Sequence, residues 1–261
     1  MPVSGNLYFS IHQETGAEYP PVVLVHGAGG MHLYWPPEIR RLRGHTVYAL
    51  DLPGHGKSDT RDGQQTTSDY ARYLVHWLDS LHLRRAVIVG HSMGSAIALE
   101  LALYHPEYVV GLILLGAGAR LRVHPQLMTF AADPTTFYKT ADLLVEWSFS
   151  PCAPQRLVEL AASRMEEVRQ SVLYGDLLAC SRFDVMDRLA GIQQPTLVIC
   201  GADDQMTPVR YAQYLATSIP DAQLCVIPGA GHMVMLEQPQ LVAENMLMFL
   251  KDISFHPGEG L

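Results

Sequence analysis

The apolar residues of the chain gather in short, uninterrupted runs. Six of these runs are four or five residues long, and polar or helical stretches separate them. Strands that are buried on both faces of a parallel sheet have this character, whereas a strand with one solvated face alternates between apolar and polar residues. The runs, which we expect to be strands of such a sheet, cover residues 22–25, 46–50, 86–89, 112–115, 196–199 and 224–227.

Helical patterns lie between the runs. Residues 69–81 carry apolar side chains at helical spacing, and residues 93–104 are small and apolar, as expected of a central helix packed on the sheet. Pro208 and Pro239 stand where the first turn of a helix begins. Strands that alternate with helices form right-handed βαβ units. The pattern therefore predicts an α/β protein with a doubly wound, mostly parallel sheet.

One long segment breaks this alternation. Residues 120–191 contain no convincing strand, but helical patterns open at Asp133-Pro134 and extend across residues 155–179. Long insertions between consecutive strands usually carry function, often as a lid over a site. We therefore predict a core domain from residues 1–119 and 192–261, with residues 120–191 inserted as a helical cap.

The composition narrows the class of protein. Hydrophobic residues make up 48% of the 261 residues and charged residues 17%, which is ample for a buried core. The formal net charge of −8 argues against a nucleic-acid partner, because recognition of a phosphate backbone needs a basic surface. The longest apolar run, residues 109–119, is too short to span a membrane, and Met1-Pro2-Val3-Ser4 lacks the features of a signal peptide. We expect a cytoplasmic protein without a membrane partner.

The segment Gly90-His91-Ser92-Met93-Gly94 has the pattern G-x-S-x-G. It follows the run at residues 86–89 and opens the small apolar helix, which is the context that a nucleophile elbow requires. A serine in this position sits on a strained turn that raises its Oγ above the sheet, and the flanking glycines avoid collisions between strand and helix. The pattern predicts Ser92 as a nucleophile.

A serine nucleophile needs a base that a third group orients, and at this kind of elbow the chain order is serine, acid, histidine. Of the 12 histidines, only His232 and His256 follow both Ser92 and the late strands. His256 lies in a Pro/Gly-rich tail, whereas His232 comes directly after the last apolar run and should share a sheet edge with Ser92. Asp203 and Asp204 both follow the preceding run. We favour Asp204, which lies further into the loop, and keep Asp203 as the alternative.

A glycine-rich loop follows the first apolar run. His26-Gly27-Ala28-Gly29-Gly30 resembles the H-G-rich motif that supplies one amide of an oxyanion hole. Small residues let the backbone approach a reacting carbonyl closely, and no Lys-Ser/Thr pair follows to favour a phosphate cradle. We assign the oxyanion donors to the amides of Ala28 and Met93, and expect His26 to fix the loop by hydrogen bonding.

Together these motifs resemble the α/β-hydrolase-fold serine hydrolases along nearly the whole chain. Residues 51–58, Asp51-Leu52-Pro53-Gly54-His55-Gly56-Lys57-Ser58, resemble the family's turn after its fourth strand. Gly229-Ala230-Gly231-His232, followed by Glu237-Gln238-Pro239, resembles its histidine loop and last helix. The resemblance implies a Ser92-His232-Asp204 triad acting on a small-molecule ester. No metal-binding motif is present, and no cofactor is expected.

The fold hosts several reactions, so the substrate stays open. The resemblance favours a carboxylic ester hydrolase that acts through an acyl-enzyme on uncharged esters of short to medium chain length. Alternatives with the same triad are a C–C bond hydrolase, an enol-lactonase and a perhydrolase. Met233 stands where C–C bond hydrolases of the family commonly have tryptophan, which counts against that alternative. A small-molecule receptor built on the same fold is the alternative outside enzymes.

The cap segment is rich in apolar and aromatic residues. Most of them should be ordinary core, but some should line an apolar acyl or alcohol pocket. Three cations of the segment could bind a substrate carboxylate, although solvated surface positions are the favoured interpretation; these are Arg120, Arg122 and Arg182. The pocket candidates are Phe130, Phe137, Trp147 and Phe149.

Overall fold

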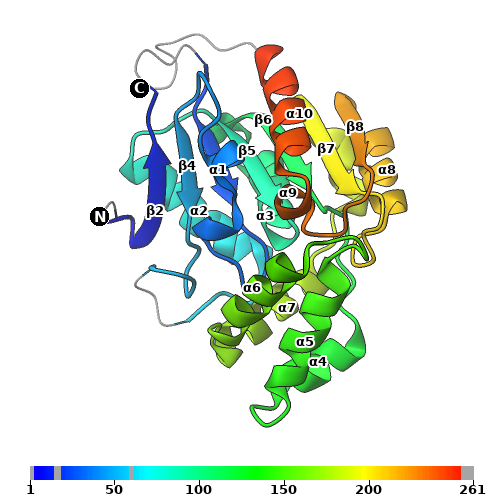
Figure 1. The fold of residues 1–261 in the computed structure, drawn as a ribbon. Helices are drawn as coiled ribbons and strands as arrows, with labels where there is room; N and C mark the ends of the chain where they lie inside the picture. The colour runs from blue at the N-terminus through cyan, green and yellow to red at the C-terminus, as the bar shows by residue number, and fades with distance from the viewer. Residues whose placement is uncertain (1–2, 15–18, 59–61, 254–261) are drawn as a thin grey trace.

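The computed structural model describes residues 3–14, 19–58 and 62–253. Within them, eight strands form one sheet in the order β1-β2-β4-β3-β5-β6-β7-β8 (Figure 1). All pairs from β4 to β8 are parallel, whereas β1 and β2 are antiparallel to their neighbours. The strands are β1 (Val3–Ser4), β2 (Leu7–His12), β3 (Val22–Val25), β4 (Val47–Leu50), β5 (Ala86–His91), β6 (Val109–Leu115), β7 (Thr196–Gly201) and β8 (Ala222–Ile227). The predicted α/β fold with a mostly parallel sheet is confirmed.

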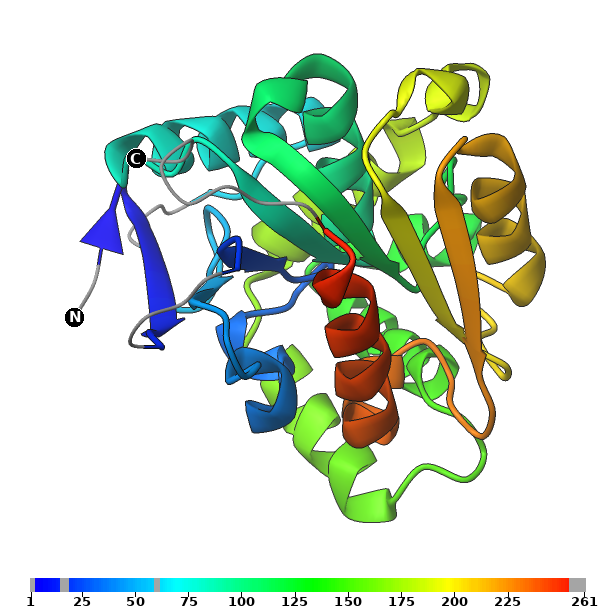
Figure 2. The same ribbon diagram turned by 90° about the horizontal axis from the view of Figure 1, so that it is seen from above.

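Helices cover both faces of this sheet (Figure 2). The α-helices are α1 (Pro37–Arg40), α2 (Thr67–Ser80), α3 (Met93–Tyr104), α4 (Pro125–Ala132), α5 (Phe137–Ser148), α6 (Gln155–Glu166), α7 (Gln170–Arg182), α8 (Val209–Ser218), α9 (Val234–Glu237) and α10 (Pro239–Lys251). Short 3-10 helices are η1 (His32–Tyr34), η2 (Pro106–Tyr108) and η3 (Met186–Gly191). Across the described part of the chain, no helix is long and apolar enough to cross a membrane.

The sheet separates two hydrophobic cores, which explains the uninterrupted apolar runs. In β3, Val23 and Val25 pack with α2, α3 and α8, while Val22 and Leu24 pack on the other face with α1 and α10. Since successive side chains of a strand point to opposite faces, every position in such a strand must be apolar. All four of these residues are fully buried.

Four helices, α4 to α7, lie between β6 and β7 at one end of the sheet (Figure 1). The expected helix over residues 155–179 is divided into α6 and α7 by a turn at residues 167–169. Apolar residues keep helical spacing through this turn, so the sequence gives no sign of it. The turn is held from outside the segment, because the Arg169 guanidinium donates a hydrogen bond to the carbonyl of Gly54 at 2.9 Å.

A buried carboxylate joins this inserted segment to the core. Asp176 of α7 is fully buried and accepts three hydrogen bonds: from the Gly29 amide at 2.8 Å, from His55 Nε2 at 2.8 Å and from the Tyr70 hydroxyl at 2.5 Å. Burial lowers the pKa of His55, but the adjoining Asp176 carboxylate outweighs it, so that the pKa is raised overall. A buried charge is tolerated when it is paired and fully hydrogen-bonded, and Asp176 meets both conditions.

We expect Asp176→Ala to lower the free energy of unfolding by about 3–5 kcal/mol, because it leaves several buried polar partners unpaired. The raised pKa of His55 sets the pH dependence: the ion pair stabilises fully below the pKa of an unfolded histidine, and this contribution is lost as the pH rises through the folded pKa. Urea unfolding at several pH values measures both effects. Asp184→Ala, at an exposed carboxylate of the same segment, is the control and should change stability by less than about 0.5 kcal/mol. Equal losses of stability in the two variants would contradict the interpretation that Asp176 joins the inserted segment to the core.

Candidate active site

Ser92 stands between β5 and α3 in a backbone conformation that few non-glycine residues adopt, with φ 52° and ψ −116°. The turn is tight on both sides: a Cβ atom on Gly90 would lie 2.2 Å from the Gly94 carbonyl oxygen, and one on Gly94 would lie 2.1 Å from the Val25 carbonyl oxygen. Only glycine fits at these two positions. Met93 is the first residue of α3, and amides in the first turn of a helix have no carbonyl partner within the helix.

His232 and Asp204 form a buried hydrogen-bonded pair. His232 Nδ1 lies 2.9 Å from Asp204 Oδ2. The other carboxylate oxygen of Asp204 accepts from the amides of Met206 and Thr207 at 2.9 and 2.8 Å. Burial raises the pKa of Asp204, but His232 and the hydrogen bonds from the amide and hydroxyl of Thr207 outweigh it and lower the pKa overall, so the carboxylate stays ionised. Asp203, the alternative acid, is exposed and lies outside this arrangement.

The other ring nitrogen of His232, Nε2, is buried without a hydrogen-bond partner in the described residues. His232 and Ser92 line the same cavity. The neighbouring His91 donates from Nε2 to the His232 carbonyl at 3.0 Å. Burial and the adjacent His232 lower the pKa of His91 to about 3, so that it is neutral near pH 7. His91 therefore fixes the backbone of His232 and carries no charge beside it. His256, the alternative histidine, and Met1 and Pro2 lie outside the described residues.

The loop after β3 lies against the serine. A Cβ atom on Gly27 would be 3.1 Å from Ser92 Cβ, so a side chain there would press on Ser92. The Gly30 amide donates to the Gly27 carbonyl at 3.0 Å, which closes a four-residue turn around Ala28. Gly29 has a φ of 62°, a left-handed conformation that glycine adopts without strain.

Hydrogen bonds to two other parts of the fold hold this turn. His26 donates from Nδ1 to the Gly27 carbonyl at 2.8 Å and accepts at Nε2 from the Leu52 amide at 3.0 Å. Burial and nearby His55 lower the pKa of His26 to about 4, which leaves it neutral near pH 7. The Gly29 amide is bound by Asp176 from α7. The turn that contains Ala28 is thus fixed from both the core and the inserted segment.

Ser92 and His232 open onto a cavity of about 840 Å³. Its apolar wall comes largely from the inserted segment, through Leu127, Leu144, Trp147, Met165 and Leu177. Its polar and charged lining includes Tyr34, Arg120, Arg122, His124, Gln205, Thr207, Arg210 and Tyr211. Tyr34, Arg210 and Tyr211 were not predicted, because they lie in no motif and outside the inserted segment.

Of the four aromatic residues predicted for the pocket, Trp147 lines the cavity and the other three do not. Phe149 is buried in the core beneath it, and Phe137 packs against the same core. Phe130 lies under the ammonium group of Lys139, at 5.3 Å from ring centroid to Nζ. Helical spacing identifies apolar residues but does not tell which of them face a cavity.

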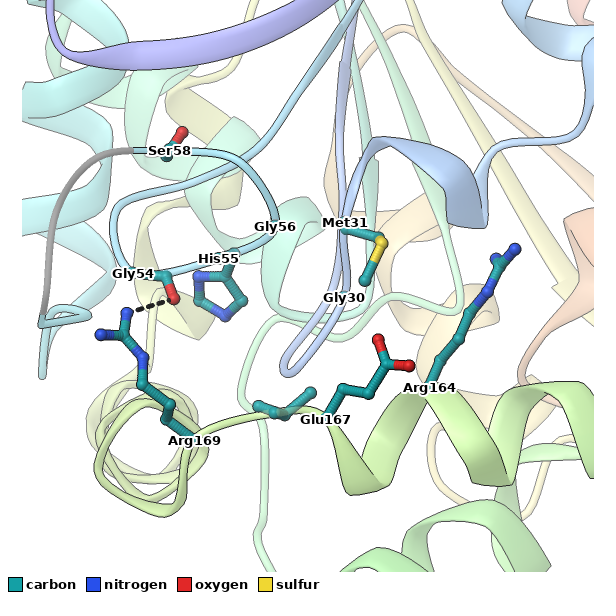
Figure 3. Close-up of a pocket in the computed structure, with 10 residues that line it drawn as sticks. Gly30, Met31, Gly54, His55, Gly56, Ser58, Arg164, Glu167 and Arg169 are labelled. Atoms are coloured by element: carbon teal, nitrogen blue, oxygen red, sulfur yellow. Dashed lines mark hydrogen bonds between the residues drawn. The ribbon is translucent and has the colours of Figure 1, made fainter.

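A second cavity of about 410 Å³ borders the loop after β3, through Gly30 and Met31 (Figure 3). Gly30 lines both cavities. Figure 3 shows His55 and Gly54 on one wall; on the other lie Arg164, from the last turn of α6, and Glu167 and Arg169, from the turn between α6 and α7. Neither Ser92 nor His232 lines it. Across the described residues, no group of three or more His, Cys, Asp or Glu side chains is placed to hold a metal ion.

The fold and the arrangement at the strand ends define the class of protein. The chain belongs to the α/β hydrolase fold family, whose sequence profile matches residues 20–239, and it is a hydrolase.

Individual relatives span nearly the whole chain. It is 30% identical over 263 residues to the proposed carbamate hydrolase RutD of Variovorax paradoxus, covering 95% of this chain and 97% of that one. It is 29% identical to the 2-hydroxy-6-oxononadienedioate/2-hydroxy-6-oxononatrienedioate hydrolase of Comamonas testosteroni, covering 93% and 91%. Among solved structures, a thermophilic esterase is 33% identical with a TM-score of 0.81, covering 95% and 99%.

Because Asp204 contacts His232 and Asp203 does not, substitution of the two carboxylates should have different effects. We expect Asp204→Asn to slow covalent labelling of Ser92 by an organophosphate by a factor approaching 10⁴, roughly the scale of the analogous change in a serine protease. The matched variant Asp203→Asn should leave the labelling rate within about twofold, as is usual for an exposed position away from the chemistry. Labelling rates measured by intact-protein mass spectrometry give the comparison, and the opposite ranking would move the acid to Asp203.

Proposed function

We propose that this hydrolase cleaves carboxylic esters, with Ser92 as nucleophile, His232 as base and Asp204 as the acid that orients it. The observation that carries the proposal is the 2.9 Å contact between His232 Nδ1 and Asp204, which leaves Nε2 without a partner in the described residues, on a side chain that lines the same cavity as Ser92. An ionised carboxylate at Nδ1 holds the proton there and stabilises the imidazolium that forms during reaction.

In the first half of the proposed reaction, Ser92 Oγ attacks the ester carbonyl while His232 Nε2 takes its proton. The carbonyl oxygen becomes an oxyanion, which the amides of Ala28 and Met93 bind. Each donor of this kind contributes about 3 kcal/mol to transition-state stabilisation. The turn at Ala28 is fixed before substrate binds, so these donors need no reorganisation during the reaction.

His232 then returns the proton to the departing alcohol, and the acyl group remains on Ser92. In the second half, water gives a proton to the same nitrogen as it attacks the acyl-enzyme, and His232 returns this proton to Ser92 Oγ when the acid leaves. His91 and His26 stay neutral near pH 7, so neither of these two rings adds a positive charge that would oppose formation of the imidazolium.

The wall from the inserted segment supports selection of the acyl chain. Leu127, Leu144 and Trp147 offer an apolar surface, and each methylene buried there contributes up to about 0.8 kcal/mol. Tyr34 adds a buried hydroxyl that has no partner in the described residues, and burial raises its pKa to about 12. It would act as a neutral hydrogen-bond donor to a polar group of the substrate.

A second candidate function is hydrolysis of a carbon–carbon bond. The name of the Comamonas relative and the three arginines of the cavity favour it. The same triad would serve it, although Met233 occupies the place of the tryptophan expected from the resemblance. Enol-lactones are a further class of substrate to test, and peroxide is a further acyl acceptor in place of water. A receptor on this fold would show no rapid multiple turnover.

We expect Ser92→Ala to abolish hydrolysis, since loss of the nucleophile from such a triad lowers kcat by about 10⁶-fold in a well-studied protease. The measurement is a panel of 4-nitrophenyl esters of increasing acyl length, run beside lactones and dienoates. Circular dichroism checks that the variant is folded. A variant that kept a tenth of the wild-type rate would refute the assignment of Ser92, and fast turnover of dienoates alone would favour the second candidate.

Trp147→Ala should shift the preferred acyl chain toward longer esters, because it enlarges the cavity where the chain binds. Phe149→Ala is the matched control: its side chain is buried in the core, so we expect a stability loss of about 3–5 kcal/mol with the chain-length preference unchanged. Profiles of kcat/KM against chain length, with melting temperatures, separate the two effects. A shift in Phe149→Ala but not in Trp147→Ala would show that the cavity wall is misassigned.

A further inference from the structure

Arginines gather on the cavity wall although the protein is acidic. The chain has 26 acidic and 18 basic residues, yet Arg120, Arg122 and Arg210 line the cavity and no described Asp or Glu side chain does. A cavity lined by charges of one sign, with low-dielectric walls, raises the local concentration of ligands of the opposite sign. The lining therefore presents a positive surface inside a negatively charged protein.

Two of the arginines lie close together in the segment that follows β6. Arg120 and Arg122 flank Leu121, which is buried, and side chains two residues apart in extended chain point to the same side. Arg120 Nη1 lies 3.3 Å from Asp184, but both side chains are 40% exposed or more, so the pair is weak. Arg122 makes no hydrogen bond or ion pair to the described residues. It is free to bind a ligand.

The third arginine lies in the helix that follows β7, the neighbour of β6 in the sheet. Arg210 lies in the first turn of α8, after the loop of β7 that carries Asp204, and its guanidinium stacks on Tyr211 at 5.2 Å. Because β6 and β7 are adjacent and parallel in the sheet, both groups of arginines emerge at the same edge. Arg182, which the sequence grouped with Arg120 and Arg122, lies off the cavity and donates to the Gln65 carbonyl.

We infer that the site takes esters that carry a carboxylate in addition to the bond that is hydrolysed, and that Arg122, supported by Arg120 and Arg210, binds this carboxylate. The inference rests on the proposed ester hydrolysis and replaces the expectation of uncharged substrates, which considered only cations of the inserted segment. A guanidinium offers two parallel N–H groups to a carboxylate, so the interaction fixes orientation as well as attracting charge.

Two pairs of esters test the inference, each pair matched in size and differing in charge. For a carboxylate on the acyl side, the pair is the mono-4-nitrophenyl ester of adipic acid and 4-nitrophenyl hexanoate. For a carboxylate on the alcohol side, the pair is 4-acetoxybenzoate and its methyl ester. We expect the wild-type protein to prefer the anion in at least one pair, and the preference to fall as salt is added, because the arginines are partly exposed.

Arg122→Gln should lower kcat/KM for the preferred anion by about tenfold, mainly through KM, which is the size of one charge-assisted hydrogen bond. The neutral partner of the pair should change by less than about twofold, since its binding makes no use of the guanidinium. Arg182→Gln is the matched control and should alter neither ester. Equal use of anion and neutral ester by the wild-type protein, or an equal loss in Arg182→Gln, would overturn the inference.

Failure of the proposed function gives a different result. If no ester in either pair is hydrolysed, ester hydrolysis fails, and anion binding is then measured without turnover. Calorimetry with the Ser92→Ala protein compares monomethyl adipate with methyl hexanoate. Tighter binding of the anion that is lost in Ser92→Ala/Arg122→Gln supports the carboxylate site, whereas equal binding of the two esters overturns it.

Discussion

The site depends on one close approach between backbones, that of Gly94 in α3 to the carbonyl of Val25 at the end of β3. The gap leaves no room for a Cβ atom, so helix and strand pack more closely than any other residue at position 94 would allow. This contact fixes Ser92 at the start of the helix. It also determines where the next residues after Val25 run, and they pass so close to Ser92 that a Cβ atom on Gly27 would lie 3.1 Å from the Ser92 Cβ. Ser92 and the turn at Ala28 are therefore set relative to each other by packing.

The sequence predicts most of the fold because the sheet is buried on both faces. Each central strand contributes side chains to both hydrophobic cores, and this produces uninterrupted apolar runs that differ from the pattern of an amphipathic helix. The residues of the candidate triad could be predicted from the sequence for a related reason. Chain order and the position of His232 directly after a strand identify a shared sheet edge, and the structure brings His232 and Asp204 together there.

Other features follow from tertiary contacts that leave no local signal. The break between α6 and α7 lies within a continuous helical spacing and coincides with a contact from Arg169 to Gly54. Trp147 and Phe149 are two residues apart and equally apolar, yet one faces the cavity and the other the core. Arg210 reaches the cavity from a helix of the core, so no inspection of the inserted segment could reveal it. Periodicity identifies which residues are buried but not what lies opposite them.

The hydrogen bond from the Gly29 amide to Asp176 has a consequence for how substrate enters. Asp176 belongs to α7, so the inserted segment and the turn at Ala28 share a support. If the whole segment swung away from the sheet, the turn would lose this support and two buried polar groups, His55 and Tyr70, would lose their acceptor. Under the proposed mechanism, access to the cavity and formation of the oxyanion site are therefore coupled: a state open enough to remove α7 would bind substrate while the turn at Ala28 lacks its support. Substrate exchange through movement of α4, α5 or α6 alone would leave these hydrogen bonds intact.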